Sequence, residues 1–329
     1  MKKNSYKKRT GIVYAILFVT VITCIWKTEA QASLWNQGDQ ETGAESDETA
    51  RSDEELYGEG MLHAPSASEE SVFSLPQNRE PTRIVWDPSW PYADYSVIHS
   101  GTATLYHASD PVGYTVCVNA GHGTLGGDQA QTLCHPDGTP KVTGGSTAEG
   151  SYYAAAVSYG TTMADGRPES AVTLSLAVLV KEILLEEGFD VLMIRESDDV
   201  QLDNIARSVI ANQYADCHLA LHYDSSAEDK GFFYISVPDA ASYKGMEPVA
   251  SHWQQHMMLG ESILDGMRAV GAKIYGSGNM PLDLTQTSYS TIPSVDVELG
   301  DQASDCSVSA QNLLARGILE GVRRFFGII

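Results

Sequence analysis

The amino-acid sequence predicts an α/β fold: a mostly parallel, mixed sheet flanked by helices on both faces, in a single domain with a disordered N-terminal extension. From residue 114 onward, short apolar and β-branched runs alternate with longer runs whose apolar residues recur at helical spacing. Several short runs are almost wholly apolar, which is typical of parallel strands buried on both faces. Imidazole or carboxylate side chains stand at the ends of some of these runs.

The first strand is expected at 116–120, Val-Cys-Val-Asn-Ala, and a Gly-His-Gly turn follows it at 121–123. A helix is expected to begin at Pro168-Glu169 and to end at Gly188, because proline in the first turn and a carboxylate beside it both favour a helix start. The later elements alternate: a strand at 189–194, a helix at 203–214, a strand at 217–221, an edge strand at 231–237, a helix at 248–270, a strand at 293–297 and a helix at 309–326.

A long insertion, residues 124–167, separates the first strand from the helix that begins at Pro168. It is dominated by Gly, Ser, Thr and Tyr. Structureless loops of this length inside a compact domain are usually lids or binding loops. We therefore expect the insertion to cover a site at His122.

The N-terminus has the features of an export signal. Basic residues within 2–9 precede an apolar run at 12–26, and Ala30-Gln31-Ala32 supplies the small residues that a signal peptidase requires. Residues 1–32 are therefore predicted to be a signal peptide, which places the mature protein outside the cell or in the cell wall. The alternative is an uncleaved membrane anchor at 10–26, and we expect no other contact with a membrane.

Two segments of different composition lie between this signal and the predicted sheet. Residues 33–80 are dense in Asp, Glu, Ser and Gly and cannot bury enough apolar area to offset their chain entropy, so we expect a disordered acidic linker. Aromatic residues and prolines return at 81–113, which we interpret as an irregular arm against the main domain. The domain itself is expected to span 114–329.

The charge of the chain restricts its partners. Its 43 Asp and Glu residues outnumber 21 Lys and Arg residues, which gives a formal net charge of −22 at pH 7. A chain this acidic repels polyanions, so nucleic acid is not an expected partner.

Four cysteines lie beyond the predicted signal peptide. Cys117 and Cys217 fall inside predicted strands and are expected to be free thiols in the core. Cys134 and Cys306 fall in loops that follow strand ends, and we expect both near the mouth of the site. In an exported chain these two either stay free or form a disulfide that holds the insertion over the site.

Polar side chains from four places converge in the predicted topology. His122, His222 and Glu298 stand at the carboxyl ends of strands, where the sites of α/β folds form. Glu169 joins them from the start of a helix. Two imidazoles and one carboxylate with an open fourth position are typical of catalytic zinc, and a further carboxylate nearby is a candidate general base.

Structural alternatives exist for each of these residues. Glu169 can serve only the helix dipole, His222 can be a capped strand-end histidine, and Glu298 can be an ion-pair partner. A second histidine pair, His252 and His256, is spaced four residues apart on a predicted helix. No third ligand is expected near that pair, so we interpret it as part of a solvated helix face.

With these residues assembled, the segment from about Tyr114 to Phe326 resembles the zinc-dependent N-acetylmuramoyl-L-alanine amidases of the amidase type 3 family. The motifs that carry the resemblance, in order, are Asn-Ala-Gly-His-Gly at 119–123, Pro-Glu-Ser at 168–170, Gly-Phe-Asp-Val at 188–191, Arg-Glu-Ser-Asp at 195–198, Arg207 with Ala211-Asn212, Ala-Leu-His at 220–222 and Pro-Ser-Val-Asp-Val-Glu-Leu-Gly at 293–300.

The resemblance implies that His122, Glu169 and His222 bind Zn²⁺ and that Glu298 is the catalytic carboxylate. It also implies the reaction, which is hydrolysis of the amide between N-acetylmuramic acid and the L-alanine of the stem peptide in peptidoglycan. Three places depart from the family's pattern at positions that line the rim of its cleft, and these affect the expected substrate preference: Asn119, Tyr223-Asp224 and residues 301–304.

Two other functions stay open at this point. A zinc peptidase acting on stem peptides would use the same residues on another bond. A wall-binding or regulatory module would keep the fold without turnover.

Overall fold

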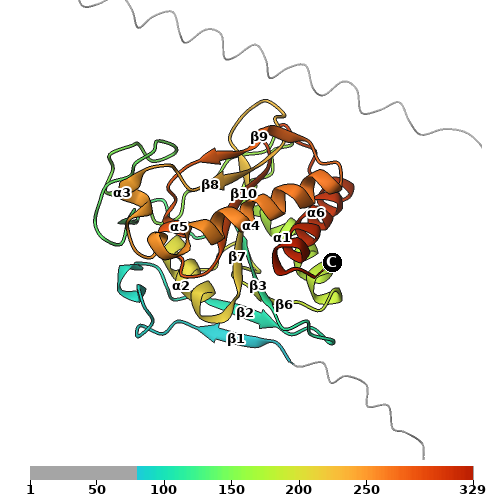
Figure 1. The fold of residues 1–329 in the computed structure, drawn as a ribbon, viewed down its shortest axis with the longest axis horizontal. Coiled ribbons are helices and arrows are strands. Elements are labelled where there is room, and N and C mark those ends of the chain that lie inside the picture. Colours follow the sequence, from blue (N-terminus) through green and yellow to red (C-terminus); the bar gives the residue numbers. More distant parts are fainter. Residues whose placement is uncertain (1–79, 329) are drawn as a thin grey trace, which may run out of the picture. The chain divides into compact units, whose positions relative to one another are not determined.

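Four parallel strands form the centre of the computed structural model, which describes residues 80–328 (Figure 1). In sheet order they are β6 (Asp190–Met193), β3 (Thr115–Ala120), β7 (Cys217–Asp224) and β10 (Ser294–Asp301). Val116 and Val118 join the core on one face of the sheet, whereas Cys117 joins the core on the other. Strands buried on both faces are therefore confirmed. The predictions for 1–32 and for 33–80, apart from Glu80, lie outside the described residues.

Antiparallel strands extend this centre on both sides and make the sheet mixed. The hairpin of β1 (Thr82–Val85) and β2 (Thr102–Tyr106) pairs with β6. On the other side β8 (Phe232–Ser236) pairs antiparallel with β10, and β9 (Ile274–Pro281) pairs parallel with β8. The expected α/β class with a mixed sheet is thus confirmed.

Two details of the predicted sheet are wrong. The segment 81–113, expected as an irregular arm, contains β1 and β2, which bury only one residue each and so show little apolar periodicity. The strand predicted at 231–237 corresponds to β8, and it is not an edge strand because β9 pairs with its outer side. The sequence of β9 contains Gly276, Gly278 and Pro281. Glycine and proline are uncommon in strands, so the sequence pattern did not predict a strand here.

Helices cover both faces of the sheet. The helices α1 (Glu169–Glu186), α4 (Val249–Ala269) and α6 (Val308–Phe326) pack together on one face, and α2 (Asn204–Tyr214) with the short α5 (Thr285–Ser288) covers the other. Figure 1 shows α4 and α6 in contact, and a Cβ on Gly266 of α4 would lie 2.2 Å from the Gly317 carbonyl oxygen of α6. Within the described part of the chain, no helix combines the length and apolar character needed to cross a bilayer.

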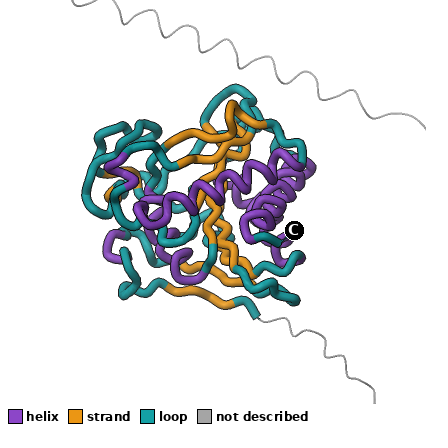
Figure 2. The backbone as a smooth tube through the Cα atoms, viewed as in Figure 1, coloured by secondary structure: helices purple, strands orange, loops and turns teal. Residues whose placement is uncertain are grey.

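The insertion 124–167 is irregular except for a small two-stranded sheet, β4 (Gln131–Leu133) and β5 (Tyr153–Ala155). Figure 2 shows loops around these short strands and around α3 (Ala241–Lys244). The prediction of a wholly structureless insertion is therefore wrong in this detail.

All four described cysteines are buried and free. The expectation for Cys117 and Cys217 is confirmed, whereas a disulfide between Cys134 and Cys306 is not formed. Cys134 lies near Lys141 and Asp283, and Cys306 lies near Tyr223 and Arg167, so the two thiols have different surroundings. Neither lines the cavity that contains His122, which corrects their expected place at its mouth.

His256 is buried rather than solvated, which corrects the prediction for the His252/His256 pair. Its side chain is 2% exposed, and its Nδ1 accepts a hydrogen bond of 3.0 Å from the Ser294 amide of β10. The reason is that this face of α4 packs against β8 and β10. His252 donates from Nδ1 to the Pro248 carbonyl oxygen.

The burial of His256 predicts that the folded protein loses stability in acid. Burial, with a further contribution from His252, lowers the pKa of His256 to about 3. The unfolded chain protonates this residue near pH 6.5, so its contribution to stability is full above about pH 6.5 and is lost as the pH falls toward 3. We expect the free energy of unfolding of His256→Gln to fall less steeply than that of the wild type, by up to ~1.4 kcal/mol per pH unit. Denaturant titrations between pH 6.5 and 4.5 measure both slopes, and equal slopes would contradict the assignment.

Candidate metal centre

The turn after β3 places His122 in the site. His122 adopts a φ of 62°, which is uncommon outside glycine and indicates a backbone held by its surroundings. Two buried arginines hold it: Arg195 donates to the carbonyl oxygens of Ala120 and Gly121, and Arg207 donates to those of Ala120 and His122. These charged donors hold the turn in addition to the backbone hydrogen bond from Gly121 to Leu221 of β7.

Burial, partly offset by Asp198, lowers the pKa of Arg195 to about 10. Burial and the positive charge of Arg195 together lower the pKa of Arg207 to about 9. Both stay charged at neutral pH. A buried charge is tolerated when all its donors are satisfied, and here the carbonyls at the end of β3 help to satisfy them.

Strand register and the start of α1 bring the other predicted residues to His122. His222 of β7 and Glu298 of β10 are register partners on adjacent parallel strands, so their side chains lie on the same face of the sheet. Glu169 is the first residue of α1, and its Oε1 accepts from the Tyr223 amide at 3.0 Å. Glu169 is 3% exposed and His122 is 7% exposed.

Three electron-pair donors converge on one point. Glu169 Oε1 lies 2.8 Å from His122 Nε2 and 3.1 Å from His222 Nδ1, and the two ring nitrogens are 3.1 Å apart. Ligand atoms around a tetrahedral zinc with bonds of 2.0–2.1 Å stand about 3.3 Å apart. The separations therefore suit a small divalent ion.

The hydrogen bond of His122 and the pKa shifts of Glu169 and His222 also favour a cation at this point. His122 Nδ1 lies 2.8 Å from the Ser158 carbonyl oxygen, which can only accept, so Nδ1 carries the proton and Nε2 offers a lone pair. Burial opposes ionisation of Glu169, but the adjacent imidazoles of His122 and His222 outweigh it and lower the pKa of Glu169. Burial likewise opposes charging of His222, yet Asp296 and Glu169 outweigh it and raise the pKa of His222 to about 10. The site thus favours positive charge where the three atoms meet.

A short backbone segment of the insertion, residues 158–161, fixes two of the three donors. We call it the strap. The Ser158 carbonyl accepts from His122, and the Thr161 amide donates to Glu169 Oε2 at 2.8 Å. Gly160 lies between them with a φ of 80°, and a Cβ there would be 2.7 Å from His122 Cδ2 and 2.9 Å from Glu169 Oε2. The strap can lie this close to the site because residue 160 is glycine.

His122, Glu169 and His222 lie in the wall of a cavity of about 710 Å³, within the usual range for ligand sites. As expected, the insertion lines this cavity, with residues 144–147 and the strap among its walls. Asp283 holds the insertion there: its carboxylate accepts from His135 Nε2 at 2.9 Å and from the Val142 amide at 2.7 Å. Burial opposes ionisation of Asp283, but these bonds outweigh it and lower the pKa of its carboxyl group.

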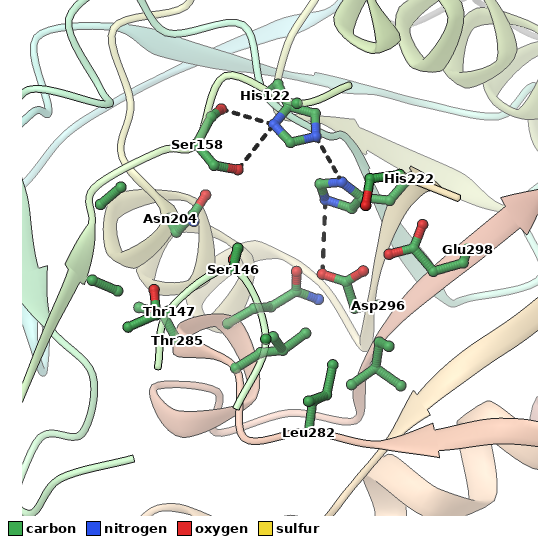
Figure 3. A pocket seen from close by; sticks show the side chains of 18 of the residues that line it. His122, Ser146, Thr147, Ser158, Asn204, His222, Leu282, Thr285, Asp296 and Glu298 are labelled. Atoms are coloured by element: carbon green, nitrogen blue, oxygen red, sulfur yellow. Dashed lines mark hydrogen bonds and ion pairs between the residues drawn. The ribbon is translucent and has the colours of Figure 1, made fainter. Parts of the chain in front are cut away.

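The described structure also shows an acidic residue that the sequence reasoning did not single out. Figure 3 shows Asp296 and Glu298 side by side on one wall, with Asp296 nearer His222. Burial, with the neighbouring carboxylates, raises the pKa of both groups. Glu298 Oε2 is buried without a hydrogen-bond partner among the described residues. The spacing of two residues on a strand was the available signal, because it puts both side chains on one face.

The three places that depart from the family's pattern do not lie together. Asn119, Tyr223 and Asp224 line the cavity. Residues 301–304 do not, which corrects the expectation that they form part of its rim. Asp301 is instead buried, with the Lys230 and Ala303 amides as donors to its carboxylate.

The fold and this cluster define a class: α/β proteins in which two histidines and one carboxylate meet as candidate metal ligands, the set that catalytic zinc sites of hydrolases use. The chain belongs to the N-acetylmuramoyl-L-alanine amidase family, whose model matches residues 116–324. Comparison with curated protein sequences finds no match.

Two solved mycobacterial structures share the fold. The apo form of the N-acetylmuramyl-L-alanine amidase Ami1 from Mycobacterium abscessus is 22% identical with a TM-score of 0.52, and the match covers 65% of this chain and 99% of that one. Ami1 from Mycobacterium smegmatis is 20% identical with a TM-score of 0.52, and the match covers 67% and 100%. At these identities the likeness shows the fold alone.

The strap can be tested with a pair of glycine variants. Gly160→Ala should weaken the binding of a divalent metal such as zinc, because the new methyl group displaces His122 or Glu169. Gly166→Ala is the matched control, since Gly166 has a φ of 87° in the same insertion but no atom within 4 Å of its Cβ position. Both variants carry backbone strain of roughly 1–3 kcal/mol, and only Gly160→Ala adds the clash. Equal metal affinity in both variants, measured against a competing chelator, would refute the role of the strap.

Proposed function

We propose that this protein hydrolyses the amide that joins the lactyl group of N-acetylmuramic acid to the L-alanine of the stem peptide in peptidoglycan. In this proposal His122, Glu169 and His222 bind Zn²⁺ and Glu298 is the general base. The observation that carries it is that three donor atoms lie within 4.8 Å of one another in the wall of a cavity that Glu298 also lines. Glu298 Oε2 is buried there without a hydrogen-bond partner among the described residues. Membership of the amidase family supports the substrate class.

The ligand set determines what the bound metal contributes. Zinc with three protein ligands lowers the pKa of a coordinated water toward ~7 and polarises a carbonyl group. The two imidazoles contribute no charge and Glu169 contributes one negative charge, so the site retains net positive charge toward the substrate. The hydrogen bond from His122 to Ser158 keeps Nε2 free of a proton.

Glu298 has the position and the environment of a proton carrier. It lies beside His222 on the adjacent strand, and its buried Oε2 has no competing donor among the described residues. Burial is the main cause that raises its pKa, which makes the carboxylate a stronger base than one in water. Glu298 accepts a proton from the attacking water and then donates it to the leaving nitrogen of L-alanine.

Two sets of variants separate metal binding from proton transfer. We expect about one zinc per chain in the wild type, and its loss in His122→Ala and His222→Ala, because two ligands do not bind zinc tightly. Glu298→Gln should keep the zinc but lose at least ~100-fold in turnover, since it can no longer accept a proton. His252→Ala, a histidine outside the site, is the control. Elemental analysis and release of peptides from purified peptidoglycan are the measurements.

The products then distinguish the possible reactions. Amidase action frees intact stem peptides that begin with L-alanine and leaves glycan strands whole. Shortened peptides that remain on the glycan would instead identify a peptidase. Zinc binding without any product would identify a wall-binding or regulatory module and would refute the proposed activity.

We also propose that the protein acts outside the cell. The support is the basic and apolar N-terminal pattern, with residues 1–32 as the signal peptide and 33–80 as the acidic linker. N-terminal sequencing of the protein from the medium or the wall fraction should then begin at Ser33. An intact N-terminus in the membrane fraction would identify an anchor at 10–26, and an intact N-terminus in the cytoplasm would contradict export.

A further inference from the structure

Asp296 lies beside a proposed metal ligand and has no part in the mechanism above. It precedes Glu298 by two residues on β10, and its register partner on β7 is Ala220, two residues before His222. Side chains at this spacing lie on the same face of the sheet. Asp296 Oδ2 is consequently 3.7 Å from His222 Nε2.

Asp296 is buried and has one ion-pair partner among the described residues. The residue is 8% exposed, and among the described residues its carboxylate forms one ion pair, with His222. Arg207, which also lines the cavity, directs its hydrogen bonds to the turn after β3 and to Leu202. A buried carboxylate is costly unless it is paired, so its position beside His222 requires an explanation.

The two nitrogens of His222 face in different directions. Nδ1 faces His122 and Glu169, and Nε2 faces Asp296. Figure 3 shows the His222 ring between His122 and Asp296. Asp296 therefore stands behind the ring, on the side away from the point where the three donor atoms meet.

We propose that Asp296 is a positioning residue for the metal centre: its carboxylate holds the proton of His222 on Nε2, so that Nδ1 presents its lone pair to the metal. The proposal rests on the zinc site proposed above. The 3.7 Å between Asp296 Oδ2 and His222 Nε2 is longer than a direct hydrogen bond, so in this structure the two groups form an ion pair. Carboxylates in this position fix the tautomer of a ligating histidine and increase its basicity.

This role differs from that of Glu298, and the difference can be measured. Asp296→Leu removes the acceptor with a side chain of similar size, and we expect zinc affinity to fall about 10- to 100-fold. Asp296→Asn keeps an oxygen that can accept from Nε2, so its loss should be smaller. Glu298→Gln should bind zinc close to wild-type affinity while losing turnover. Competition with a chelator of known affinity gives these constants.

Asp224→Asn is the control for charge. Asp224 also lines the cavity, but its carboxylate pairs with Lys230 Nζ at 2.6 Å and, among the described residues, forms no hydrogen bond or ion pair with His222. Its removal takes one negative charge from the cavity without touching the ring. Equal losses of zinc affinity in Asp224→Asn and Asp296→Leu would show that the net charge of the cavity alone accounts for the effect. That result would overturn the proposal.

Two further readouts separate positioning from a merely structural role. In the zinc-loaded wild type, nitrogen-labelled histidine should show a slowly exchanging Nε2 proton on His222, and Asp296→Leu should lose that signal. The circular dichroism of the metal-free Asp296→Leu protein should match that of the metal-free wild type, so that a loss of zinc affinity cannot be attributed to a loss of the fold.

Wild-type zinc affinity in Asp296→Leu would overturn the inference. Zinc retained by both His122→Ala and His222→Ala would instead remove the metal site on which it depends.

Discussion

Two imidazole nitrogens and a carboxylate oxygen lie 2.8–3.1 Å from one another in this protein, and each offers a lone pair toward the other two. Without a cation or shared protons between them, such an arrangement is repulsive. Protons can supply the positive charge, and the raised pKa of His222 and the lowered pKa of Glu169 show that the site favours such charge. A divalent ion serves the same charge balance and adds chemistry that protons cannot supply. The rest of the site can be understood as what keeps these three atoms together.

Several parts of the chain share that task. Arg195 and Arg207 hold the turn of His122 through its carbonyls, and the strap contacts both His122 and Glu169 through its backbone. Asp283 joins the insertion to the segment after β9 and so keeps the insertion against the cavity. Each connection uses charged or backbone groups rather than apolar contact, which fixes direction as well as distance. A site built this way is rigid where the chemistry requires placement to within a fraction of an ångström.

The sequence predicted the elements that carry dense apolar patterns. The strand β3 is buried along nearly its whole length, and the helix α1 buries a regular apolar stripe. The predicted residues follow from these elements and β7, because His122 comes after β3, Glu169 begins α1 and His222 lies near the end of β7. It did not predict β1, β2 or β9, because these strands at and near the edges of the sheet bury few residues and their pairing depends on distant partners. The roles of Gly160 and Asp296 also depend on contacts between segments far apart in the chain. Such contacts leave no local pattern in one sequence.

The central claim is that His122, Glu169 and His222 are the ligands of a catalytic zinc ion. X-ray absorption at the zinc edge of the loaded protein tests it most directly, because the spectrum reports the ligand atoms themselves. We expect nitrogen and oxygen ligands at ~2.0–2.2 Å, with the multiple-scattering pattern of two imidazoles. Sulfur at ~2.3 Å, or a shell of oxygen atoms without imidazole, would contradict the claim.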